Sequence, residues 1–261
     1  MANIEEREHW IESPGGSLYG KTWTPHDLES TCPLILLHDS LGSVALWRDF
    51  PKRLAGAVRR RVIAYDRLGF GLSAARSDIL EKDFIRAEAE RFLPLVCKAL
   101  SVSDFIVCGH SVGGGMAVET GAAFPDRCRG VVTIAAQAFV DERICNGIRI
   151  AGREFANGDD MARLARYHGD KAEWVLSAWI ETWLAPGFAD WTLDSALQKL
   201  QCPLFAIHGE RDEYGSVAHA LKIAERGRGR CEILPDVGHT PHRECPDLLI
   251  DEMRKWLAQS G

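Results

Sequence analysis

Short apolar runs alternate along the chain with longer amphipathic segments. The apolar runs predict strands at residues 9–12, 17–23, 33–39, 60–66, 104–110, 130–136, 203–209 and 231–236. The amphipathic segments predict helices at residues 46–57, about 82–100, 112–123, 217–227 and 246–258. From residue 33 onward the strands consist almost entirely of Val, Ile, Leu and Phe, which indicates that both faces of the sheet are covered. The alternation predicts an α/β fold with a mostly parallel, eight-stranded sheet and helices on both faces.

The segment 137–195 does not follow this alternation of strands and helices. It contains no convincing strand, and its pattern predicts several helices. Half of the chain's eight tryptophans lie in it: Trp174, Trp179, Trp183 and Trp191. Because the strand pattern resumes at 203–209, we interpret the segment as an insertion between two strands of one sheet. The predicted domains are a core formed by residues 1–136 and 196–261, and a helical cap formed by residues 137–195.

Composition and charge narrow the classes of function. The chain is 46% hydrophobic and 26% charged, which excludes a disordered, collagenous or coiled-coil protein. A net charge of −6 leaves no basic excess to bind nucleic acid or an anionic membrane. No apolar run approaches the roughly 18 residues that a transmembrane helix needs, and the first residues do not resemble a secretory signal. The cysteines form no CxxC pair of the kind found in zinc and redox sites. We expect a soluble, cytoplasmic protein that acts on a small molecule.

A serine between glycines is the first candidate for chemistry. The sequence GHSVG at 109–113 follows a predicted strand and precedes a predicted helix. A sharp strand-to-helix turn requires small residues two positions before and after the serine, because neighbouring backbone segments come into contact there. The turn also places the N–H of Val112 at a helix N-terminus, where it can stabilise an oxyanion. We predict Ser111 as a nucleophile and Val112 as an oxyanion donor.

A serine hydroxyl needs a base, and the base needs a carboxylate that fixes its tautomer. His239, in the segment that follows the last predicted strand, is the candidate base. Asp212, in the loop after the strand 203–209, is the preferred carboxylate. Its rivals are Glu210, Glu213 and Asp141. The chain order Ser111, Asp212, His239 is the order found in one known class of hydrolase.

With these motifs the chain resembles the α/β-hydrolase superfamily over essentially its full length. Five segments carry the resemblance: LLHDSLGS at 36–43, YDRLGFGLS at 65–73, GHSVGG at 109–114, HGERDEYG at 208–215 and PDVGHTPH at 235–242. The resemblance implies acyl transfer through a serine ester, with the N–H of Ser40 as the second oxyanion donor. The family usually has glycine where this chain has Asp39. Branches that attack epoxides or haloalkanes carry Asp at the position of Ser111, so the resemblance implies a serine hydrolase.

We expect the substrate to be a carboxylic ester or lactone that is small and largely apolar. The candidate lining residues are Leu41, Phe70, His110, Phe139, Trp179 and Trp183. The same residues could instead cleave a carbon–carbon bond or form peracids, or the protein could be a non-catalytic ligand sensor whose cap closes on its ligand.

No cofactor or metal is expected. His239 and His242 form an HxxH pair, but no third ligand stands at a suitable spacing. The segment 15–22 matches the phosphate-loop pattern GxxxxGKT, but β-prone residues and Pro25 follow it where that loop needs a helix. We therefore interpret it as a hairpin turn.

Overall fold

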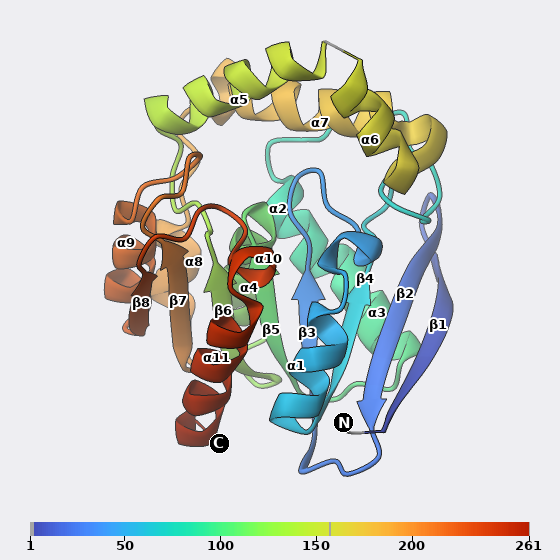
Figure 1. Ribbon diagram of the computed structural model, residues 1–261, viewed down its shortest axis with the longest axis vertical. Helices are drawn as coiled ribbons and strands as arrows, with labels where there is room; N and C mark the ends of the chain where they lie inside the picture. Colours follow the sequence, from blue (N-terminus) through green and yellow to red (C-terminus); the bar gives the residue numbers. More distant parts are fainter. Residues whose placement is uncertain (1–2, 157, 261) are drawn as a thin grey trace.

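The computed structural model describes residues 3–156 and 158–260. Within these ranges, eight strands form one sheet in the order β1-β2-β4-β3-β5-β6-β7-β8 (Figure 1). The strands are β1 (Ile4–Ser13), β2 (Gly16–Pro25), β3 (Ser30–Leu37), β4 (Arg60–Tyr65), β5 (Phe105–His110), β6 (Cys128–Ile134), β7 (Leu204–Gly209) and β8 (Arg230–Leu234). Strands β1 and β2 form an antiparallel hairpin, β2 pairs antiparallel with β4, and the remaining pairs are parallel. The predicted fold class is confirmed, and the segment 15–22 lies in the β1–β2 hairpin.

Successive residues of the central strands enter two different hydrophobic cores, one on each face of the sheet. Leu34 and Leu36 of β3 join one core, whereas Ile35 and Leu37 join the other. The first core includes residues of α1 (Phe50–Val58) and α11 (Pro246–Ser260). The second includes residues of α3 (Leu93–Ala99), α4 (Val112–Ala123), α8 (Asp194–Lys199) and α9 (Ala218–Gly227). This two-sided burial explains the continuous apolar strands in the sequence.

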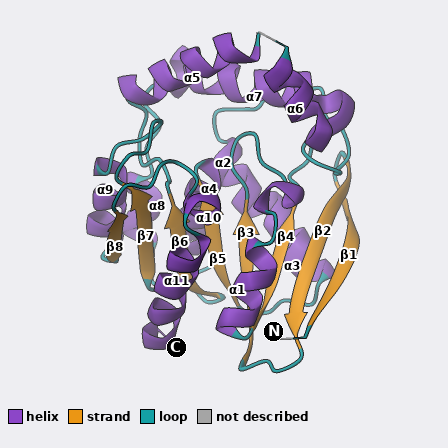
Figure 2. Ribbon diagram, viewed as in Figure 1, coloured by secondary structure: helices purple, strands orange, loops and turns teal. Residues whose placement is uncertain are grey.

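Three helices lie above the carboxyl ends of the strands (Figures 1 and 2). They are α5 (Glu142–Phe155), α6 (Asp159–His168) and α7 (Ala172–Leu184), which we call the upper helices. Helix α7 packs against both α5 and α6. A β-bridge between Phe139 and Thr192 joins the two ends of the segment that carries them. Helix α8 begins at Asp194, inside the expected cap range, but packs against α4 and α9.

The predicted helix at 82–100 is interrupted in the structure. It consists of α2 (Phe84–Ala87), a π-helical turn η2 (Glu88–Phe92) and α3. Pro94 has no backbone N–H to donate to the carbonyl four residues earlier, so the regular α-helical ladder cannot continue through it. Likewise, the helix expected at 46–57 is a 3₁₀ turn, η1 (Val44–Trp47), followed by α1.

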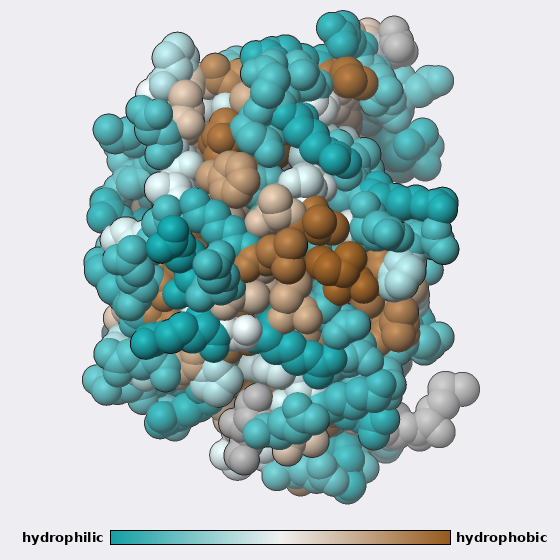
Figure 3. Space-filling model, turned by 90° about the vertical axis from the view of Figure 1, so that its left-hand side faces the viewer, coloured by the Kyte–Doolittle hydropathy of each residue, from teal (hydrophilic) through white to brown (hydrophobic). Residues whose placement is uncertain are grey.

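The surface on the α9 and β8 side is mostly hydrophilic, with a hydrophobic area at mid-height (Figure 3). The large hydrophobic side chains that are exposed elsewhere in the described part of the chain are scattered over different elements, as is usual for globular proteins. Among the described residues, no helix is both long and apolar enough to cross a membrane.

Candidate active site

Ser111 lies in the turn that joins β5 to α4, at the carboxyl edge of the sheet. Its backbone has φ +54° and ψ −125°, a conformation that non-glycine residues rarely adopt and that concentrates at functional sites. A Cβ atom at Gly109 would overlap the carbonyl oxygen of Gly113, and one at Gly113 would overlap the carbonyl oxygen of Leu37. These contacts are the physical reason for the glycines on either side of the serine.

Two backbone N–H groups in the loops around the cavity have no hydrogen-bond partner among the described residues. Val112 is the first residue of α4, so its N–H has no partner within the helix. Ser40 lies in the loop after β3 and lines the same cavity as Ser111. The neighbouring Asp39 accepts the N–H of Leu41 on Oδ1 at 2.8 Å, and no hydrogen bond within the described residues uses the N–H of Ser40. The arrangement suits the stabilisation of an oxyanion.

The buried Asp212 and the half-buried His239 form a hydrogen-bonded pair. Oδ2 of Asp212 lies 2.8 Å from Nδ1 of His239. The other oxygen, Oδ1, accepts the backbone N–H groups of Tyr214 at 2.8 Å and Gly215 at 3.0 Å, which fixes the carboxylate in the loop after β7. Oδ2 also lies 3.2 Å from Nε2 of the buried His208.

Asp212 and His239 shift each other's pKa in opposite directions. Burial opposes the ionisation of Asp212, but its hydrogen bonds with His239 and the backbone outweigh burial and lower its pKa to about 2. Burial also disfavours the imidazolium of His239, yet the hydrogen bond with Asp212 outweighs it and raises the pKa of His239. The carboxylate is therefore ionised at neutral pH and stabilises a proton on the imidazole.

Ser111 and His239 line one cavity but share no hydrogen bond in this structure. The hydroxyl of Ser111 donates a long hydrogen bond, 3.4 Å, to Oε1 of Gln137. Gln137 was not among the predicted residues, although it directly follows a predicted strand at the edge where the site forms. Hydrogen bonds between a catalytic serine and its base are often long or absent in structures without a substrate.

The rival carboxylates occupy other places. Asp141 caps α5, because its Oδ1 accepts the N–H of Ile144 at 2.9 Å, and its Oδ2 lies 3.6 Å from Nε2 of the buried His219. Glu210 accepts the N–H of Asp236. Glu213 accepts the backbone N–H of His239 at 3.3 Å, so it contacts the loop but not the ring. Of the four candidates, Asp212 is the one bonded to the imidazole.

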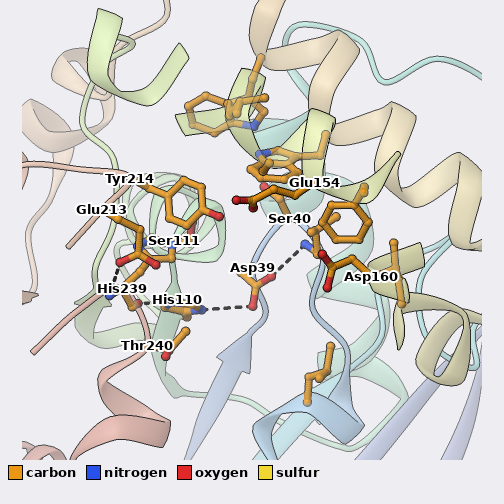
Figure 4. A pocket seen from close by; sticks show the side chains of 18 of the residues that line it. Asp39, Ser40, His110, Ser111, Glu154, Asp160, Glu213, Tyr214, His239 and Thr240 are labelled. Carbon is orange, nitrogen blue, oxygen red and sulfur yellow. Dashed lines mark hydrogen bonds and ion pairs between the residues drawn. The ribbon is translucent and has the colours of Figure 1, made fainter. Parts of the chain in front are cut away.

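A cavity of about 510 Å³ lies between the strand ends and the upper helices (Figure 4). Four of the six candidate lining residues border it: Leu41, His110, Trp179 and Trp183. Phe70 does not, because it packs under the upper helices against His168 and Trp174. Phe139 does not either, because its ring lies 4.3 Å from that of the buried His219.

Charged as well as apolar side chains line the cavity. The sequence reasoning missed two kinds of lining residue, the apolar and aromatic Ile144, Ile148, Phe155 and Tyr214, and the charged Glu154, Asp160, Arg163 and Arg243. The described residues contain no group of three or more His, Cys, Asp or Glu side chains able to hold a metal ion. His242, the second member of the HxxH pair, packs 4.7 Å from the ring of Trp47.

Comparison with known proteins agrees with this architecture. The sequence model of the alpha/beta hydrolase fold matches residues 33–244, which is most of the chain and spans Ser111, Asp212 and His239. The chain belongs to the α/β-hydrolase family. The resemblance seen in the sequence is therefore confirmed.

The chain is similar to several proteins that are named as hydrolases. Serine hydrolase BPHL of Mus musculus is 27% identical over 230 residues, covering 82% of this chain and 75% of that protein. The 2-hydroxymuconate semialdehyde hydrolase of Pseudomonas sp. (strain CF600) is 25% identical and covers 90% of both chains. Carboxylesterase CesB from Bacillus subtilis shares the fold with a TM-score of 0.71 at 20% identity, covering 98% of this chain and 93% of that one.

Proposed function

We propose that this α/β-hydrolase cleaves a carboxylic ester or lactone of a small molecule through an acyl-enzyme on Ser111. The observation that carries the proposal is the 2.8 Å contact between Asp212 and His239 on the cavity that also holds Ser111 at its strained turn. A general base bound to an ionised carboxylate, next to a serine, is the arrangement that activates a hydroxyl nucleophile.

The proposed reaction has two halves. In the first, Nε2 of His239 takes the proton of Ser111, and Oγ bonds to the substrate carbonyl. The N–H groups of Ser40 and Val112 stabilise the resulting oxyanion. The tetrahedral intermediate collapses, the ester C–O bond breaks, and His239 returns its proton to the leaving alkoxide. In the second, water gives a proton to His239 as it attacks the acyl group. The new tetrahedral intermediate collapses, the bond between the acyl carbon and Oγ breaks, His239 returns its proton to Oγ of Ser111, and the carboxylic acid leaves.

The upper helices are proposed to act as a cap over the reacting atoms. Residues 137–195 would form this cap, with the core on either side of it in the sequence. Trp179 and Trp183 border the cavity from α7, so they would exclude water and contact the acyl group. The cysteines of the chain are all free thiols, which supports a cytoplasmic location, and the proposed reaction uses no cofactor.

Hydrolysis of p-nitrophenyl acetate and butyrate tests the proposal. Wild type should release p-nitrophenolate with saturation kinetics, and Ser111→Ala should lower kcat by a factor on the order of 10⁴ or more. Equal release by wild type and Ser111→Ala refutes a serine hydrolase. No turnover by wild type, together with saturable binding, favours the ligand-sensor alternative.

Carbon–carbon bond hydrolysis is the second candidate, favoured by the similarity to 2-hydroxymuconate semialdehyde hydrolase over 90% of both chains. The same two variants can be compared on a vinylogous 1,5-diketone, whose cleavage consumes a visible chromophore. Serine-dependent cleavage of this substrate much faster than of the esters would assign the enzyme to that branch.

A further inference from the structure

The ring of His110 joins the three segments that carry the proposed chemistry. It is 1% exposed. Its Nε2 lies 2.8 Å from the backbone carbonyl oxygen of His239, and its Nδ1 lies 3.2 Å from Oδ2 of Asp39 (Figure 4). His110 directly precedes Ser111, and Asp39 directly precedes Ser40. One buried ring therefore connects the nucleophile turn, the oxyanion loop and the base loop.

A carbonyl oxygen accepts and cannot donate, so Nε2 of His110 is the donor to His239. The other ring nitrogen, Nδ1, faces Oδ2 of Asp39, and Oδ1 of the same side chain accepts the N–H of Leu41. The side chain of Asp39 therefore connects the His110 ring to the backbone of the oxyanion loop.

The other groups packed against His110 are rings, and none of them can take the place of the Asp39 carboxylate. The rings of His239 and His242 lie 4.9 and 4.6 Å away, and that of Trp47 lies at 6.3 Å. Burial lowers the pKa of His242 well below its usual range, so this ring is neutral.

Two guanidinium groups and one further carboxylate lie near the pair. Nη2 of Arg67 donates to the backbone carbonyl of Asp39 at 2.8 Å. Arg243, in α10 (Pro241–Glu244), and Glu213, which accepts the N–H of His239, line the same cavity as Asp39 and His110. Asp39 is the only one of these groups whose carboxylate bonds the His110 ring.

We propose that Asp39 and His110 form a hydrogen-bonded pair that positions the backbone of His239 and of Ser40 relative to Ser111. The proposal rests on the proposed hydrolase function. Both are positioning residues, because they act through the loops that carry the base and the oxyanion donor. Through this pair the side chain of Asp39 connects the oxyanion loop to the nucleophile turn.

Three variants and a control separate this role from mere packing. In Asp39→Asn, the amide oxygen still accepts the N–H of Leu41, and the NH₂ group donates to Nδ1 of a neutral His110, so kcat on p-nitrophenyl butyrate should stay within about fivefold of wild type. Asp39→Ala and His110→Phe lose the contact, so kcat should fall about 10- to 100-fold with little change in KM. Asp126→Asn removes an exposed carboxylate beside the other end of the sheet and serves as the control.

The comparison of the two Asp39 variants gives a second readout. Asp39→Asn keeps a hydrogen-bonding group against Nδ1 of His110 and Asp39→Ala does not, so Asp39→Ala should lose kcat while Asp39→Asn and Asp126→Asn stay near wild type. Normal kcat in Asp39→Ala, or equal loss in Asp39→Asn and Asp39→Ala, would overturn the proposal.

Nitrogen-15 NMR of the histidine rings tests the hydrogen-bonded pair without any substrate. The Nδ1 signal of His110, assigned by its loss in His110→Phe, should move strongly in Asp39→Ala and stay in place in Asp126→Asn. A signal that does not move in Asp39→Ala contradicts the pair even if Ser111→Ala proves inactive. A signal that moves, in an enzyme whose Ser111→Ala variant is fully active, would instead leave the pair intact and refute the hydrolase function.

Discussion

Asp212→Asn is the sharpest test of the proposed carboxylate. Oδ1 of Asp212 accepts two backbone N–H groups, from Tyr214 and Gly215. An asparagine must keep its oxygen at this position, so its NH₂ group points at Nδ1 of His239, where Oδ2 now lies at 2.8 Å. The amide then donates to Nδ1, which moves the ring proton to Nε2. A ring with its proton on Nε2 cannot accept the proton of Ser111.

The expected loss is large and confined to activity. The same exchange in a serine protease triad lowers kcat by about 10⁴, which corresponds to about 5.5 kcal/mol of transition-state stabilisation. The side-chain volume and the two hydrogen bonds to Oδ1 are unchanged, so the melting temperature should move by only a few degrees. The assay is kcat on p-nitrophenyl butyrate, with Ser111→Ala as the floor and differential scanning fluorimetry for stability.

Asp141→Asn is the matched control. Asn caps a helix about as well as Asp, so the hydrogen bond to Ile144 survives and α5 should keep its stability. Its kcat should remain close to wild type. The reasoning is refuted if Asp212→Asn retains activity while Asp141→Asn loses it, because the carboxylate that supports His239 would then be Asp141.

Two further predictions concern the base and the turn. The ring of His239 must be neutral to accept a proton, and its pKa is raised. We therefore expect kcat/KM to rise with pH and to level off only above about 6.5, the pKa of a free imidazole. A plateau that extends well below that pH would contradict this prediction. Gly113→Ala should destabilise the fold by about 3 kcal/mol, because the new Cβ atom would overlap the carbonyl oxygen of Leu37. In the control Gly187→Ala the new Cβ atom has no neighbouring atom within 4 Å, so the melting temperature should not change. Equal melting temperatures of the two variants would argue against the close contact at Gly113.

The strands and the main site residues could be predicted because their signals are local. Each buried strand is a run of apolar residues between turns, and GHSVG encodes its own tight turn through the two glycines. His239 and Asp212 each follow a strand that ends at the same edge of the sheet. In a parallel sheet this places their loops together, whatever the details of the connecting helices.

Other features depend on packing that the sequence does not reveal. The sequence predicts Phe70 and Phe139 as lining residues. In the structure they pack against the buried rings of His168 and His219, outside the cavity. The polar lining comes from α5 and α6, whose orientation above the sheet determines which face reaches the cavity. The contact between Asp39 and His110 joins positions 71 residues apart, so only the folded chain brings it into view.

Covalent labelling of Ser111 tests the central claim most directly. A p-nitrophenyl alkylphosphonate should react once per chain, with Oγ of Ser111 displacing p-nitrophenolate from phosphorus, and peptide mass spectrometry should place the phosphonyl group on the peptide that contains residues 109–114. The adduct should be absent from Ser111→Ala and should form far more slowly in His239→Ala. Stoichiometric labelling that persists in Ser111→Ala, or an unchanged rate in His239→Ala, would contradict the account.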